Sequence, residues 1–141
     1  MRSAPSAEAW RDPRGASTAD RLVVTACRLV AEHGEDATSL RAVAQAAGCS
    51  PSLVVHHFGS RAGLLEACDR AVVALLDEAL APLLNGADPG TSSVESVAGA
   101  LLAAADDDPV LAYALRSLTE GGRAGHHLFV ALFEHARRLE D

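Results

Sequence analysis

The chain has 141 residues, of which 49% are apolar, 22% are charged and 4% are aromatic, and its formal net charge is −7. The apolar content excludes a disordered chain, and the 29 alanines favour helices over a β-sandwich. No apolar run approaches the roughly 18 residues that a membrane span needs, and the N-terminus lacks the apolar stretch of a signal peptide. We therefore expect an all-α protein that does not enter a membrane.

The charge is divided unequally along the chain. Residues 1–70 hold eight arginines and eight acidic residues, whereas residues 71–141 hold four arginines and eleven acidic residues. Because phosphate groups repel an acidic surface, any contact with nucleic acid must come from the first half. The cysteines Cys27, Cys49 and Cys68 show no CxxC spacing, which predicts buried, reduced thiols in a cytoplasmic protein and no structural zinc site.

The first segments in chain order are an arm and a helix. Residues 1–16 contain two prolines and three arginines, which predicts a flexible arm, either a plain tail or an arm that touches DNA. Ser17 followed by Asp20 resembles a capping box, and Gly34 is typical of a helix end. These signals predict a helix from about Thr18 to His33.

Four further signals define the next three helices. A helix from Thr38 or Ser39 ends before Gly48, and Ser50 with Pro51 begins a short helix that reaches about His57. Ser60 caps a long helix over about 61–84.

The second half predicts a loop at 85–91 and helices over about 93–105, 109–119 and 126–139. No strand pattern remains anywhere in the chain. The fold class is therefore all-α, with three short helices joined by a long fourth helix to a small helical region.

Residues 38–58, with the sequence TSLRAVAQAAGCSPSLVVHHF, carry the most functional information. Two short helices joined through Gly48 and Ser50 have the layout of a helix-turn-helix, whose second helix enters the major groove of DNA. The preceding amphipathic helix and the following long helix sharpen this interpretation.

Residues 18 to about 70 resemble the DNA-binding domain of the TetR family of bacterial repressors. The resemblance rests on AEHG at the end of the first helix, on ATSLRAVAQAAGCS and on VVHHFGSRAGLLEA. Val55 stands where the family usually has tyrosine, and His56 stands where another aromatic residue is common. Cys49 replaces the usual valine, and Gly59 replaces the usual proline.

The resemblance implies a domain organisation and partners. We expect a flexible arm at 1–16, a helix-turn-helix domain at 17–64 and a helical regulatory and dimerisation domain at 65–141. In the family this second domain forms homodimers and often binds a small-molecule effector that releases the DNA. Here it is shorter than usual, so we expect it to be incomplete, either in a short variant or in a truncated product.

Ten residues are candidates for contact with DNA. Hydroxyl groups and free N–H groups at a helix start suit phosphate oxygens, arginine suits guanine or phosphate, and the first residues of a recognition helix meet base edges. The resemblance adds the end of that helix and the start of the next, where the family contacts phosphate. The candidates are Thr38, Ser39, Arg41, Ser50, Pro51, Ser52, Leu53, His56, His57 and Arg61. Capping, core packing and solvated faces are the alternative interpretations of these positions.

Leu102, Tyr113 and Phe129 are candidates for an effector pocket, with ordinary core packing as the alternative, and Tyr113 has the only polar group of the three. The histidine pair at 56–57 lacks a third metal ligand, and Asp106–Asp108 lacks the spacing of a calcium loop. We expect neither a metal nor a cofactor.

The sequence therefore predicts a sequence-specific DNA-binding regulator, specifically a ligand-responsive repressor that acts as a homodimer on a palindromic operator in the cytoplasm, at the nucleoid. The alternative is a degraded or truncated family member that acts through protein association without specific DNA binding. The sequence shows no nucleophilic residue paired with a general base and no phosphate-binding loop, so it does not support an enzyme.

Overall fold

A computed structural model describes residues 17–84, 99 and 102–120, and the single positions 126, 130, 133, 134 and 137. All regular secondary structure in these residues is α-helical, which confirms the predicted all-α class. The predicted arm at 1–16, the loop at 85–91 and most of the predicted helices at 93–105 and 126–139 lie outside the described residues.

Four helices follow one another in the first half: α1 (Thr18–His33), α2 (Leu40–Ala47), α3 (Pro51–Phe58) and α4 (Arg61–Leu84). A serine side chain satisfies a free N–H group at the start of each one, as the sequence predicts. The acceptors are Oγ of Ser17, Ser39, Ser50 and Ser60, at 3.0–3.3 Å from the N–H nitrogens of Asp20, Ala42, Leu53 and Gly63.

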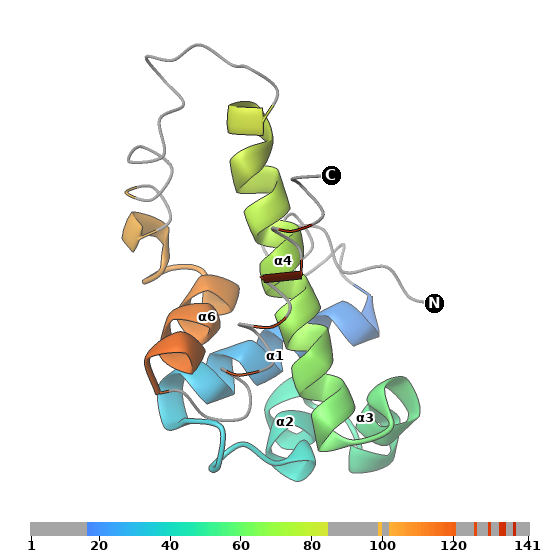
Figure 1. Cartoon of the computed structure of the whole chain (residues 1–141). Coiled ribbons are helices and arrows are strands. Elements are labelled where there is room, and N and C mark those ends of the chain that lie inside the picture. The colour runs from blue at the N-terminus through green and yellow to red at the C-terminus, as the bar shows by residue number, and fades with distance from the viewer. Residues whose placement is uncertain are drawn as a thin grey trace.

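Figure 1 shows α4 as the longest helix, with α2 and α3 near its N-terminal end and α6 (Pro109–Glu120) beside α1. The predicted start of α6 is confirmed, because Asp108 Oδ1 accepts the N–H of Val110 at 3.0 Å. Since α6 also packs against α4, the second half of the described chain rests directly on the helices of the first half.

One hydrophobic core joins the five helices whose bounds are given above. Small residues contribute to this core, with Ala26, Ala44 and Ala71 each at 0% exposure, and their short side chains suit close packing of helices. The largest enclosed side chains are Tyr113, Leu22, Leu64, Val30, Val43, Val54, Val72 and Val110. The predicted domain boundary at 64/65 falls inside α4, and the core is continuous on both sides of it. The division into two domains therefore stays a prediction.

Arg116 of α6 reaches the C-terminal end of α1. Its Nη1 donates to the carbonyl oxygen of Ala31 at 2.8 Å, and its Nε donates to Oε1 of Glu120 at 2.7 Å. A cation at this position also complements the partial negative charge of a helix C-terminus. The contact fixes α6 to α1 across 85 residues of sequence.

Cys27 and Cys68 are fully buried, as the sequence predicts, whereas Cys49 is only half-buried, and all three are free cysteines in the structure. Burial, together with the neighbouring Cys68 thiol, raises the pKa of Cys27 well above its ordinary value. Within the described residues, no helix combines the length and the hydropathy that a bilayer crossing requires.

Candidate nucleic-acid interface

The turn between α2 and α3 is three residues long and is closed by backbone hydrogen bonds. Gly48 adopts the left-handed conformation with φ +74°, which a residue with a side chain rarely adopts. The N–H of Cys49 then donates to the carbonyl of Ala44 at 2.9 Å, and Ser50 caps α3. Because Ala44 is fully buried, the turn is tied to the interior and α3 leaves it in a fixed direction.

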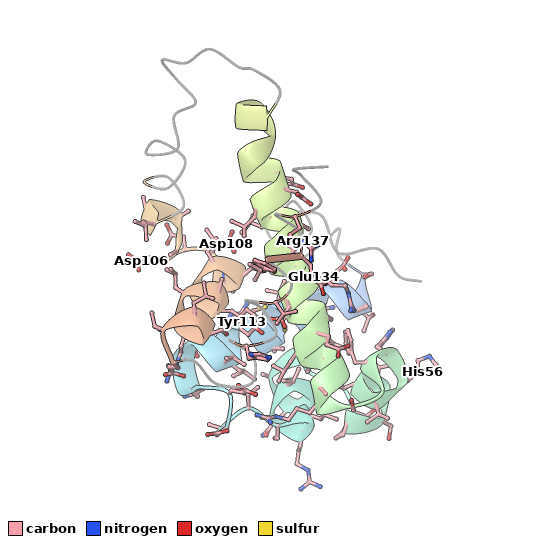
Figure 2. All side chains as sticks on the ribbon, in the orientation of Figure 1. His56, Asp106, Asp108, Tyr113, Glu134 and Arg137 are labelled. Carbon is pink, nitrogen blue, oxygen red and sulfur yellow. The ribbon has the colours of Figure 1, made fainter. Side chains whose placement is uncertain are left out.

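One face of α3 is packed and the other is exposed. Val54 is 0% exposed, and Phe58, one turn later, packs against the same core. The exposed residues of α3 and its cap are Ser50, Pro51, Ser52, Val55 and His56, while Leu53 and His57 are half-buried. His56 projects away from the body of the molecule in Figure 2. The predicted recognition helix therefore presents a solvent-facing surface of mixed polar and apolar groups.

Two neighbouring residues at the start of α2, both predicted to contact phosphate, differ in their exposure to solvent. Ser39 is exposed, and its Oγ accepts the N–H of Ala42, whereas Thr38 is 5% exposed and its hydroxyl donates to the carbonyl of Gly34 at 2.9 Å. Arg41, two residues after the cap, is exposed. Ser39 and Arg41 are exposed to solvent, while the hydroxyl of Thr38 is directed inward and holds the turn that precedes α2.

Arg61 is placed differently from the prediction of a simple phosphate contact. Its Nε donates to the carbonyl of Thr38 at 2.8 Å, and its Nη2 donates to the carbonyl of Glu35. A guanidinium group has five N–H donors, so these two bonds leave others for a further acceptor. The arrangement ties the start of α4 to the turn between α1 and α2, and it thereby positions Ser39 and Arg41.

The start of α4 is also packed tightly against the end of α3. A Cβ atom on Gly63 would overlap the carbonyl oxygen of Phe58, so only glycine allows this approach of the two helices. The rings of His56 and His57 lie edge to face with their centroids 5.5 Å apart. Among the described residues, no group of three or more His, Cys, Asp or Glu side chains is placed to hold a metal ion.

The structure describes two of the three residues predicted to line an effector pocket. Leu102 is 63% exposed, so it lies in solvent and not in an enclosed cavity. Tyr113 is 0% exposed, and its hydroxyl donates to Oδ1 of Asp69 at 2.6 Å. The polar group of Tyr113 is thus already satisfied within the core, and Figure 2 shows this residue between α6 and α4. Phe129 lies outside the described residues.

Asp69 is a buried acid that the sequence analysis did not identify as important. It is 4% exposed, and burial raises the pKa of its carboxyl group to about 7, against the hydrogen bond from Tyr113, which lowers it. Burial likewise raises the pKa of Tyr113. No local pattern marks Asp69, because a single acid in a long helix is usually solvated and its partner is 44 residues away.

Val55 was noted only as a departure from the family pattern, yet it is the most exposed large apolar residue of α3, at 45%. The sequence does contain a signal for this exposure. Val55 lies three residues after Ser52, and residues three apart lie on the same face of a helix.

Comparison with known proteins agrees with this geometry. The sequence model of a family described as "Bacterial regulatory proteins, tetR family" matches residues 22–68. The HTH-type transcriptional regulatory protein RaaS of Mycobacterium tuberculosis is 36% identical over 107 residues, which are 72% of this chain and 46% of RaaS. The HTH-type transcriptional regulator BetI of Rhizobium meliloti is 38% identical over 69 residues, which are 48% of this chain and 34% of BetI.

The chain therefore spans less than half the length of each of these relatives. The matched segment contains most of α1, all of α2, the turn and α3, and the start of α4. It coincides with the part whose helix order, serine caps and left-handed glycine turn form a helix-turn-helix. Residues 22–68 of the chain are therefore similar to the helix-turn-helix segment of the tetR family of bacterial regulatory proteins.

Proposed function

We propose that this protein is a sequence-specific DNA-binding regulator of transcription whose α3 enters the major groove. The observation that carries the proposal is the exposed face of α3, which begins with Ser50, Pro51 and Ser52 and lies opposite the buried Val54. The first residues of a recognition helix are those that meet base edges in helix-turn-helix proteins.

Arg41 and Ser39 extend this surface onto the start of α2. Both are exposed, and arginine forms either two hydrogen bonds to guanine or an ion pair with phosphate. Thr38 and Arg61 act in the proposal mainly as positioning residues, because their described hydrogen bonds fix the turn from which α2 starts. Leu53 and His57, both half-buried, lie at the margins of the surface.

The finer parts of the proposal come from the family. They are repression, a homodimer on a palindromic operator, release by a small-molecule effector, and action in the cytoplasm at the nucleoid. In such a dimer the two α3 helices would lie about one helical turn of DNA apart, roughly 34 Å, so that each reads one half-site. The relatives RaaS and BetI, both described as HTH-type regulators, support the regulatory role.

The test is DNA binding by the full chain, measured by fluorescence anisotropy on DNA from upstream of its own gene at several salt concentrations. We expect affinity to fall steeply with salt, and Arg41→Ala to weaken binding at least about tenfold. Arg70→Ala is the matched control, because Arg70 is also exposed but lies nine residues into α4, roughly 14 Å along the helix from Arg61.

Equal losses in the two variants would mean that overall charge, and not the α2–α3 face, drives binding. A chain that stays folded and shows no salt-dependent binding to any duplex would overturn the proposal. Light scattering of the same samples, with and without DNA, tests the homodimer separately.

A further inference from the structure

Val55 is an exposed apolar residue between the polar residues Ser52 and His56, at the place where α3 would meet bases. It is 45% exposed, although its neighbour Val54 is fully buried. Successive helical residues are turned by about 100°, so the inward position of Val54 fixes Val55 on the solvent side. Ser52, three residues earlier, and His56, the next residue, are exposed with it.

The chemistry of valine limits what this side chain can contact. It has no hydrogen-bond donor or acceptor, and its branched carbon holds it near one preferred rotamer in a helix. Placed over the polar edge of guanine, adenine or cytosine, it would bury that edge without a partner, which is unfavourable. The major groove offers one apolar group on a base edge, the C5-methyl group of thymine.

We propose that Val55 reads thymine by packing its methyl groups against the C5-methyl group of that base, once in each half-site. The inference rests on the proposed function, since it requires α3 in the major groove. Ser52 and His56, which have polar groups, then contact the bases or phosphates on either side. In the free protein the side chain of Val55 is exposed to water, and in the complex the thymine methyl group would cover it.

The test first selects binding duplexes from a random DNA pool with the full-length chain. We expect a thymine at one fixed position of each half-site in the selected sequences. Selection with Val55→Ala should keep the rest of the motif and lose the preference at that position. This variant exposes less apolar surface and favours a helix, so α3 is expected to remain folded.

The second step replaces each half-site thymine in turn by deoxyuridine, which differs from thymidine only in lacking the methyl group. At the position that Val55 reads, we expect the substitution in one half-site to lower the affinity of the parent chain for the duplex about fourfold. One buried methyl group contributes about that factor to an affinity. Val55→Ala loses the contact in both half-sites, so it should bind the thymine duplex about sixteenfold more weakly than the parent chain, and its affinity should not respond to deoxyuridine. Leu118→Ala is the matched control, because Leu118 is 46% exposed on α6, away from α3, and its removal should leave the thymine preference intact.

The outcomes separate the two proposals. If the parent chain binds selected duplexes in a salt-dependent manner and tolerates deoxyuridine at every position, thymine reading by Val55 is wrong while DNA recognition by α3 stands. If Val55→Ala retains the response to deoxyuridine, another residue reads the methyl group. If no duplex is selected, both the thymine contact and the proposed function fall.

Discussion

The α2–α3 surface and the junction of α6 with α1 and α4 are built in different ways. On the α2–α3 surface, serine caps and the turn join residues three to five apart, such as Ser50 with Leu53 and Cys49 with Ala44. At the junction, side chains join partners 44 and 85 residues apart. The first region can form its local contacts early and independently, whereas the second depends on the complete packing of the chain.

The two regions also differ in where their polar groups lie. The polar groups of the α2–α3 surface face water, where an unmade hydrogen bond costs little. Asp69 and Tyr113 lie in the core, where each depends on the other and where charge is unfavourable. Changes at the junction should therefore affect stability strongly and depend on pH, and changes on the α2–α3 surface should affect mainly binding.

The largest expected effect comes from removing the buried charge with Asp69→Asn. The folded-state pKa of about 7 is above the ordinary value of 3.8, so the folded chain holds an extra proton between these values. The contribution of Asp69 to stability is therefore most favourable below about pH 4 and falls as the pH rises to about 7. Above that range the buried carboxylate costs up to about 4 kcal/mol, which Asn avoids while keeping an oxygen for the Tyr113 hydroxyl.

We therefore expect Asp69→Asn to stabilise the chain at pH 8 by a few kcal/mol and to change it little at pH 4. Urea unfolding followed by circular dichroism at both pH values measures this difference. The groups that set the pKa, besides burial and Tyr113, are Glu66, Glu35 and Arg70. Equal effects of the variant at both pH values would show that Asp69 is not a buried charge, and the contrast between the two regions would lose its main support.

A second change, Tyr113→Phe, removes the donor and keeps the ring. It leaves the Asp69 carboxylate without its described partner, so we expect a loss of about 1–3 kcal/mol at pH 8 and a smaller loss at pH 5, where Asp69 is protonated. At pH 8, Tyr113→Phe should cost less stability in the Asp69→Asn background than in the parent chain, because that background has no buried carboxylate to leave without a donor. Simple additivity in urea unfolding would mean that the two side chains do not act through their hydrogen bond.

The sequence was a good guide to the α2–α3 region because its signals are local. Serine at a cap, proline at the first helical position and glycine in a left-handed turn each act within a few residues. The helices that these signals predicted begin within two residues of the observed starts at Thr18, Leu40, Pro51 and Arg61. The chemistry of the residues and the resemblance to a known family together gave the candidate contacts.

The junction was not predictable in the same way. Tyr113 was considered for a ligand pocket because it has a polar group on an apolar face, but that group is satisfied by Asp69 from another helix. Outside the junction, Arg61 is a further example: it is predicted to contact phosphate, and in the structure it also donates to two carbonyl groups of the α1–α2 turn. In each case the partner is 23 or more residues away, and no pattern of residue spacing encodes such a pair.

The smallest expected effect tests whether the α2–α3 surface really depends on local contacts. Ser50→Ala removes the cap of α3, which should cost about 1 kcal/mol in urea unfolding, and Ser50→Asn, which still caps a helix, should cost a few tenths. Because Ser50 is exposed, neither variant should change the pH dependence that Asp69 produces. If both variants were as stable as the parent, the packing of Val54 would hold α3 by itself, and the cap would matter only for the direction in which α3 presents Ser52 and Val55.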